Sequence, residues 1–369
     1  MTTGKKFLLL LRSGMGLDVE WQDKQGEWLP AIDSEDEWLL VMRLANEQTL
    51  QGILYEGVRR LPERYRPPRK IVLRSYMLGE KVSKLNVRCN EAAAKLYVQL
   101  SEAGFACCIL KGQGNALAYP CPCARVPGDI DVWVAAPARS VIGYARRSLA
   151  KARACYHHVD YVKCDGVDVE LHYRPAFLNN PIHNRRLQRW FAAEASAQCS
   201  HKVTLPGAAG DVSVPTDAFN RIFQMAHIVN HLIHEGIGMR QLMDYYFLLR
   251  RGLTDEERRR DALLLRRFGL HDIAAAVMYA LQWLFALPQE QMIVAADKKR
   301  GVVLLKEVLE GGNFGRYAER SLKAHTQLDR NMGRLRRDWK LLAAFPSECL
   351  CEPLFRLWHF MWRVGHGNI

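Results

Sequence analysis

The stretch Gly128-Asp129-Ile130-Asp131-Val132-Trp133-Val134 puts two carboxylates at the start of a short apolar run. The run from Ile130 to Val134 is typical of a buried strand. Because side chains alternate along a strand, Asp129 and Asp131 point to the same face. Carboxylates held that close repel each other unless a cation lies between them, and Mg²⁺ prefers carboxylate oxygens. A solvated Asp-x-Asp loop is the ordinary alternative.

A second segment, Val167-Asp168-Val169-Glu170-Leu171-His172, alternates strictly between apolar and polar residues. It follows Cys164-Asp165-Gly166, and Asp-Gly between alternating runs is a strong hairpin signal. We therefore predict strands at 156–163 and 167–173. If the second of these lies beside the strand at 130–134, Glu170 becomes a third carboxylate. An ordinary strand with one solvent-exposed face would give the same pattern.

A third segment, Leu110-Lys111-Gly112-Gln113-Gly114, ends an apolar run that begins at Phe105. We expect a buried strand at 105–110 and a short helix at 115–119. Glycines between them let backbone N–H groups approach a phosphate, and a helix N-terminus favours its charge. An ordinary turn that binds no ligand would have the same sequence pattern. Lys111 could pair with a triphosphate or point into water.

Helical patterns flank this middle region. Ser34-Glu35-Asp36-Glu37 is a capping-box pattern that starts a helix, which we expect to run on to Leu61-Pro62. Further helices are predicted at 71–104, with Gly79 as a candidate break, and at 138–152. A loop-rich bridge is expected from Pro175 to Pro215. Helices then follow at 216–235, at 240–251 and on to about Trp362, where Trp358-His359-Phe360-Met361-Trp362 is expected to pack a terminal helix.

The predicted fold class is α+β, with a small mixed β-sheet in an α/β core. N-terminal helices and a mostly helical C-terminal half flank this core. We divide the chain into a helical region at 1–84, the core at 85–215 and a helical domain at 216–369.

The composition is that of a soluble globular protein, with 369 residues, 49% hydrophobic and 25% charged. The early apolar run, Phe7 to Leu11, is too short for a secretory or membrane-spanning segment. We therefore expect a cytoplasmic protein without a membrane partner, its ten cysteines reduced. The net charge of +13 suits a phosphate-bearing ligand, from a nucleotide up to RNA. Runs that combine acidic and basic residues, such as 254–260, are typical of solvated helix faces. No DNA signal or RNA-binding module is recognisable in the sequence.

The order of these segments resembles the DNA polymerase β-like nucleotidyltransferase superfamily. More closely, the chain resembles an uncharacterised bacterial nucleotidyltransferase family over about residues 85–250. The matching motifs are Leu110-Lys111-Gly112, Arg125-Val126-Pro127-Gly128-Asp129-Ile130-Asp131, Glu170-Leu171-His172, and a downstream helical segment with His227, His231 and Gly236-Ile237-Gly238-Met239-Arg240-Gln241-Leu242-Met243-Asp244.

This resemblance implies an enzyme that moves a nucleoside monophosphate from an NTP to a hydroxyl group of a small molecule, a protein or RNA. Asp129, Asp131 and Glu170 would be catalytic and would hold two Mg²⁺ ions, with Mn²⁺ as a substitute. One ion lowers the pKa of the acceptor hydroxyl, and the other neutralises charge on the α-phosphate and pyrophosphate. Nucleotide contacts would come from Lys111, Gly112, Gln113, Gly114 and Arg125.

One departure from the wider superfamily concerns Gln113, since many members have a serine there that helps to hold the phosphates. It favours an alternative function, a catalytically weak nucleotide-binding regulatory protein that retains the fold. A helical nucleic-acid-binding protein is a third hypothesis. The acceptor, the preferred NTP and the oligomeric state stay open.

Several downstream side chains are candidates to line a substrate cleft: His172, His227, His231 and Arg240. His227 and His231 are four residues apart on one helix face, with His234 a turn further on. This spacing fits zinc binding, a cleft lining or ordinary packing, but lacks the glutamate of a metalloprotease motif. Arg240 and Asp244 are also four apart, and we predict that they pair and hold their helix against the core.

Overall fold

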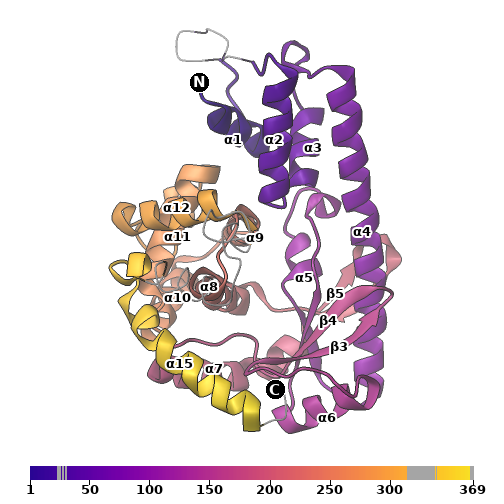
Figure 1. The fold of residues 1–369 in the computed structure, drawn as a ribbon, viewed down its shortest axis with the longest axis vertical. Coiled ribbons are helices and arrows are strands. Elements are labelled where there is room, and N and C mark those ends of the chain that lie inside the picture. The colour runs from indigo at the N-terminus through magenta and orange to yellow at the C-terminus, as the bar shows by residue number, and fades with distance from the viewer. Residues whose placement is uncertain (23–25, 27–28, 30, 314–336, 338, 366–369) are drawn as a thin grey trace.

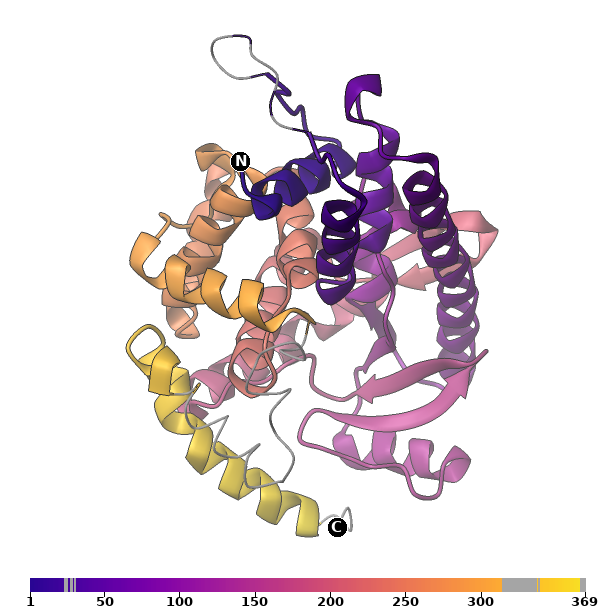
Figure 2. The ribbon, with the colours of Figure 1, turned by 45° about the horizontal axis from the view of Figure 1, so that its top comes forward.

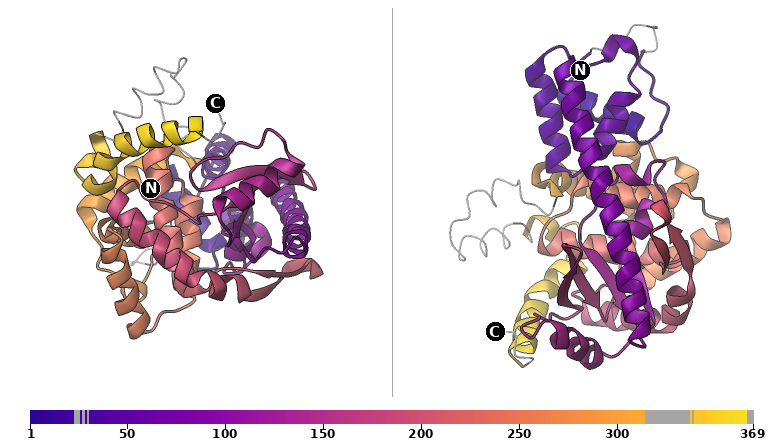
Figure 3. Two further views of the ribbon diagram at one scale, coloured as in Figure 1. Left: turned by 90° about the horizontal axis from the view of Figure 1, so that it is seen from below. Right: turned by 90° about the vertical axis from the view of Figure 1, so that its right-hand side faces the viewer.

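The computed structural model describes residues 1–22, 26, 29, 31–313, 337 and 339–365. Helices α1 (Thr3–Gly14), α2 (Glu35–Glu47) and α3 (Gln51–Arg59) pack together at the N-terminal end of the molecule (Figure 1). The long helix α4 (Arg69–Glu102) leaves this bundle and runs on past the sheet (Figure 3, right). Helix α4 thus joins the N-terminal helices to the sheet, crossing the expected division near residue 84.

Two expectations for these helices were wrong. Helix α4 continues through Gly79, where a Cβ atom would lie 2.3 Å from the Tyr55 ring, so the glycine permits close packing rather than a break. The helix expected from Ser34 to Leu61 is two helices, divided at Gln48–Leu50. Gln48 is buried there, and its amide group bonds to Val308 O and Met239 N–H, which ties the break to distant parts of the chain.

The predicted mixed sheet is confirmed. Its strands are β1 (Cys107–Leu110), β2 (Ile130–Val134), β3 (His158–Cys164) and β4 (Val167–His172), in the order β1-β2-β4-β3. Strand β4 lies parallel to β2, and the other neighbours are antiparallel. Asp165 and Gly166 both have positive φ angles, as the type I′ two-residue hairpin turn requires. The hairpin therefore delivers β4 to the centre of the sheet, next to β2.

The two faces of the sheet are buried against different parts of the chain. On one face, Val132 packs in a cluster with residues of α4 and of helix α6 (Ala138–Ser148). On the other, Cys108, Leu110 and Trp133 join a larger cluster with the N-terminal and C-terminal helices. Asp131 shares the face of Trp133 because the two are two residues apart on β2. The acidic end of β2 is thereby directed at the helical half.

The segment from Pro175 to Pro215 is not the loop-rich bridge that the sequence suggested. It contains helix α7 (Pro181–Ser200) and a hairpin of β5 (Lys202–Leu205) and β6 (Gly210–Ser213). The side chain of Asn180 accepts hydrogen bonds from the N–H groups of Ile182 and His183, with proline at the first helical position. Few residues of α7 are buried, so its apolar periodicity is weak.

The predicted C-terminal helices are present, on the opposite side of the molecule from the sheet (Figure 2). Those described are α8 (Asp217–His234), α9 (Met239–Arg250), α10 (Asp255–Arg267), α11 (His271–Phe285), α12 (Lys298–Gly311) and α15 (Pro346–Gly365). Short helices are α5 (Gly112–Ala116), η1 (Glu63–Tyr65), η2 (Pro122–Ala124), η3 (Pro206–Ala208) and η4 (Gln289–Gln291). Within the described ranges, no helix combines the length and the apolar character needed to cross a membrane.

Candidate functional site

Three carboxylates meet where β2 and β4 lie side by side. The strand register pairs Asp131 with Glu170, and Asp129 precedes β2 on the same face as Asp131. One oxygen from each of the three lies within 4.8 Å of the others. Asp129 is exposed, Asp131 is buried and Glu170 is intermediate. The convergence depends on the parallel pairing of two strands that are about 40 residues apart in the chain.

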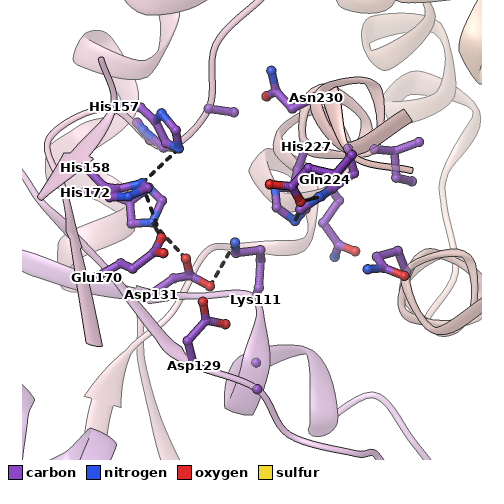
Figure 4. Close-up of a pocket in the computed structure, with 18 of the residues that line it drawn as sticks. Lys111, Asp129, Asp131, His157, His158, Glu170, His172, Gln224, His227 and Asn230 are labelled. Carbon is purple, nitrogen blue, oxygen red and sulfur yellow. Dashed lines mark hydrogen bonds and ion pairs between the residues drawn. The ribbon is translucent and has the colours of Figure 1, made fainter. Parts of the chain in front are cut away.

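Basic groups surround Asp131 (Figure 4). Lys111 Nζ lies 2.8 Å from its Oδ2 atom, and His172 Nε2 lies 2.7 Å from its Oδ1 atom. Burial alone would raise the pKa of Asp131, but these two partners hold it well below its usual range. His172 Nε2 also lies 3.2 Å from Glu170. Burial would lower the pKa of His172, and its hydrogen bonds to the two carboxylates instead raise it to about 9.

Asp129 has the opposite electrostatic character. Repulsion by Asp131, followed by loss of solvation, raises the pKa of Asp129 to about 6. The site therefore contains one carboxylate held ionised by local cations and one that is short of positive charge. A further cation beside Asp129 would relieve that repulsion.

The turn after β1 adopts a strained backbone. Lys111 has φ 50° and ψ −131°, outside the regions that residues other than glycine favour, and Gly112 follows with φ 32°. Gly112 lines the cavity above the carboxylates, but the next two residues do not. Gln113 is buried and its amide donates to Asn90 of α4. A Cβ atom at Gly114 would lie 3.1 Å from Val214, so this glycine allows close packing.

The carboxylates lie in a cavity of about 670 Å³ between the sheet and α8, with Gln224 and His227 across from them (Figure 4). This volume is in the usual range for small-molecule sites. His172, His227, His231 and Arg240, the residues suggested for a substrate cleft, all line this cavity. Its walls hold seven of the chain's twelve histidines: His157, His158, His172, His227, His231, His234 and His359.

Sequence reasoning missed some of these residues. His158 is the register partner of His172. Counting back from the Asp165-Gly166 turn would have paired His172 with Val159 instead, because the register shifts between Tyr161 and Cys164. Phe355 and His359 come from α15, almost 200 residues further along the chain, and no local pattern connects them with the site.

The histidines of α8 contact one another and other polar groups. His227 Nε2 and His231 Nε2 are 2.9 Å apart, and His231 Nδ1 lies 3.1 Å from Glu235. Burial lowers the pKa of His227 well below its usual range, so this imidazole is neutral. Among the described residues, the groups with convergent metal-ligand atoms do not include the α8 histidines. Their geometry thus fits a cleft wall rather than a zinc site.

Arg240 and Asp244 do not pair as predicted. The Asp244 carboxylate instead accepts two hydrogen bonds from Arg125, at 2.7 and 2.8 Å, and one from the Tyr119 hydroxyl at 2.6 Å. Arg240 donates to Val126 O at 3.0 Å. The planar guanidinium of Arg125 bonds to the carboxylate at two positions, which makes this a strong charge-assisted contact. Helix α9 therefore holds the loop that leads into Asp129. The contact between this helix and the core was predicted for Arg240 and Asp244, and it is instead made by the ion pair of Arg125 and Asp244.

Comparison with known proteins gives a match to a family model. The model, described as an uncharacterised nucleotidyltransferase, matches residues 34–286, which is more than half of the chain. The chain belongs to this family. No curated protein gives a match. Among solved structures, the chain is similar to an antigenic nucleotidyltransferase-like protein from Paracoccidioides brasiliensis, with 11% identity over 56% of this chain and 93% of that chain and a TM-score of 0.29.

The family match, at residues 34–286, is wider than the region of about 85–250 in which the motifs suggested the resemblance. It begins at the start of α2 and ends just after α11, so it includes the sheet, α8 and α9. Helix α15 lies beyond the match, yet it contributes Phe355 and His359 to the cavity. Part of the cavity wall is therefore built from sequence outside the family region.

Proposed function

We propose that this nucleotidyltransferase transfers a nucleoside monophosphate from an NTP to an acceptor hydroxyl, in a metal-dependent reaction at Asp129, Asp131 and Glu170. The observation that carries the proposal is the convergence of these three carboxylates in a cavity large enough for a nucleotide. The basic side chains of Lys111 and Arg240 line the same cavity. Carboxylates and cations on one cavity wall suit a ligand that combines metal ions with phosphates.

The donor set fits Mg²⁺, with Mn²⁺ as a substitute, because all three ligands are carboxylate oxygens. The raised pKa of Asp129 supports this fit, since a bound cation would offset its repulsion by Asp131. Lys111 and His172 already contact Asp131, but each carboxylate oxygen has two lone pairs and can serve a second partner. Two bound ions would activate the acceptor hydroxyl and neutralise charge on the departing pyrophosphate.

The chain's own groups then have distinct roles in the proposal. Lys111 would exchange its contact with Asp131 for one with the triphosphate, and the N–H group of Gly112 would face the same phosphates. Arg125 has two of its nitrogens bonded to Asp244, while its Nη1 atom is buried without a partner among the described residues. That atom is the part of Arg125 we assign to phosphate. Gln113 would hold the shape of the turn through its hydrogen bond to Asn90, and Gly114 through its close packing against Val214.

A second candidate function is a nucleotide-binding regulatory protein with little turnover. Two observations favour it: Gln113 occupies the position of the superfamily's serine and bonds to α4, and Lys111 already pairs with Asp131. Both predict nucleotide binding without pyrophosphate release. The acceptor in the leading proposal is a hydroxyl-bearing small molecule, protein or RNA.

The deciding experiment incubates the full chain with Mg²⁺ and each α-labelled NTP and follows pyrophosphate release and transfer of label. Asp129→Asn should lower the rate by about 10²–10³-fold, comparable to the loss of one strong electrostatic contact in other active sites. Asp168→Asn is the matched control, because Asp168 lies on β4 two residues from Glu170 but is exposed and paired with Lys163. Its rate should stay within twofold of the unchanged chain.

Three other outcomes would go against the proposal. Calorimetry that detects Mg²⁺-dependent NTP binding without pyrophosphate release would support the regulatory alternative. Turnover that Asp129→Asn leaves unchanged would place the chemistry elsewhere. Absence of any NTP binding, together with RNA binding that weakens steeply with salt, would support a nucleic-acid-binding protein.

A further inference from the structure

A second set of metal-ligating side chains lies at the edge of the same cavity. It belongs to the turn Cys155–His158, which leads into β3. One ligand atom from each of Cys155, His157 and His158 lies within 4.8 Å of the other two. The Cys155 Sγ atom is 3.4 Å from His157 Nδ1, and His157 Nε2 is 2.9 Å from His158 Nδ1. These two contacts use different nitrogens of His157, so an ion would take one of them. Tetrahedral zinc with bonds of about 2.0–2.3 Å needs ligand atoms about 3.3–3.8 Å apart, which small side-chain rotations within this cluster would supply.

The backbone of this turn is fixed by hydrogen bonds. Cys155 N–H donates to His158 O at 2.9 Å, which closes the turn. The N–H groups of Tyr173 and Arg174 both donate to His157 O, at 3.0 and 3.1 Å, and thereby tie the turn to the end of β4.

Side chains hold the same turn from two further directions. The Arg174 guanidinium donates to Tyr156 O at 2.7 Å, and Tyr156 N–H donates to His359 of α15 at 3.1 Å. The three ligands are therefore held close together before any ion binds. This order lowers the entropic cost of binding.

The ligand chemistry differs from that of the carboxylate site. A thiolate and two imidazoles favour Zn²⁺ and related transition-metal ions, whereas three carboxylates favour Mg²⁺. His157 and His158 line the cavity. An ion held by three protein ligands there would keep a fourth coordination position for water or a ligand in the cavity, as in zinc sites that bind substrates.

We propose that Cys155, His157 and His158 bind one Zn²⁺-class ion whose fourth coordination position opens to the cavity. The thiol proton leaves to solvent when the thiolate binds the ion. The site differs in chemistry from the carboxylates but adjoins them, since His158 Nδ1 also lies 3.2 Å from Glu170. The proposal does not require that nucleotidyl transfer take place. A ligand in the cavity could then reach both this ion and the carboxylates.

The test uses the full chain, stripped with a chelator and titrated with Co²⁺ in the absence of NTP. We expect one Co²⁺ per chain at this site, with a thiolate-to-cobalt charge-transfer band in the near ultraviolet and visible bands typical of tetrahedral cobalt. Added Zn²⁺ should displace the cobalt and abolish these bands. Elemental analysis of the zinc-loaded chain after dialysis should find one zinc.

Variants assign the ligands. Cys155→Ser should abolish the charge-transfer band, and His157→Gln should weaken Co²⁺ binding by at least tenfold. Cys164→Ser, which removes the thiol at the far end of β3 and outside the convergent set, should change neither. Asp129→Asn should leave the cobalt spectrum unchanged, which separates this site from the proposed Mg²⁺ site.

Far-ultraviolet circular dichroism checks that each variant is folded, and His157→Gln provides a second route if Cys155→Ser does not fold. The proposal is overturned if the unchanged chain retains neither Co²⁺ nor Zn²⁺. It is overturned as well if the bound cobalt lacks a thiolate band, or if Cys155→Ser and His157→Gln bind cobalt as the unchanged chain does. In those cases the thiol and imidazoles only bond to one another.

Discussion

Lys111 sets the charge balance of the carboxylate site. Its ammonium group lies 2.8 Å from Asp131, in a place where it would compete with the proposed metal ion for the same oxygen. At an effective dielectric constant of 20, two unit charges 4 Å apart interact by about 4 kcal/mol. The strained backbone at Lys111 directs the side chain into the site rather than into solvent. In the proposed function, this residue is thus the point at which metal binding and phosphate binding would be coupled.

Replacing Lys111 by methionine should therefore change two measurements in opposite directions. Without the competing ammonium, the nucleotide-free chain should bind Mn²⁺ at least tenfold more tightly, which equals about 1.4 kcal/mol. Pyrophosphate release should slow, because a phosphate contact is lost. Mn²⁺ titration by calorimetry or electron spin resonance measures the first effect. Lys163→Met, which removes an exposed partner of Asp168, is the control, and weaker Mn²⁺ binding in Lys111→Met would contradict the competition.

Asp244 is a second residue whose charge matters, here for stability. It is buried, and its oxygens accept hydrogen bonds from Arg125 and Tyr119. Asp244→Asn should lower the free energy of unfolding by about 3–5 kcal/mol at pH 7, because Arg125 is left without its charge partner. Asp255→Asn, in an exposed pair with Arg258, should cost less than about 1 kcal/mol. Urea unfolding measures both, and equal effects would contradict a buried clamp.

The same clamp predicts a pH dependence. Burial alone would raise the pKa of Asp244, but Arg125 and Tyr119 lower it below the usual value. The unfolded carboxyl group, with a pKa of about 3.9, then binds protons more readily than the folded one. Its stabilising contribution is complete above that pH and is lost as the pH falls through the lower folded value. The difference in unfolding free energy between the unchanged chain and Asp244→Asn should shrink below about pH 4 and stay constant above it.

Elements with a strong local signal were predictable from the sequence. Strand β2 has a short apolar run and β4 has strict alternation, the Asp165-Gly166 turn defines the hairpin of β3 and β4, and Thr216 caps α8 as expected. The carboxylates followed from the same patterns. Helix α7 was missed because few of its residues are buried, and the break at Gln48 because its cause lies in contacts with Met239 and Val308. Features that depend on contacts between distant parts of the chain, including the part of the cavity wall formed by α15, have no local sequence pattern that would predict them.

The crossing of α1 and α3 gives a prediction for whole elements. A Cβ atom at Gly57 of α3 would lie 2.2 Å from Leu10 O of α1, so the two helices approach as closely as glycine permits. Gly57→Ala should therefore lower the unfolding free energy by about 1–3 kcal/mol. Gly143 lies in α6 with nothing within 4 Å of a Cβ atom, and Gly143→Ala should be neutral or stabilise by up to about 1 kcal/mol. Thermal unfolding distinguishes the two; a stable Gly57→Ala variant would mean that the crossing can widen.

At the scale of the molecule, the cavity depends on parts from most of the chain. The larger core cluster extends from Phe7 to Cys349 and includes side chains of β1, β2, α8 and α9. Helix α4 crosses the proposed division between residues 1–84 and 85–215 without a break. We therefore expect the N-terminal helices and the helices around the cavity to unfold together, although the sequence suggested three regions.

Nucleotide binding offers a test of that coupling. A ligand at 100 times its dissociation constant stabilises the folded state by about 2.7 kcal/mol, which slows exchange through global unfolding about 100-fold. If the core unfolds as one unit, Mg²⁺ and NTP should slow exchange equally for the most protected amides of α3 and α8, although α3 does not line the cavity. If residues 1–84 unfold separately, only α8 should respond. Hydrogen exchange followed by mass spectrometry compares the two helices in one sample. Asp129→Asn, which should weaken metal-dependent binding, serves as the control because its exchange should show little response to the same additions.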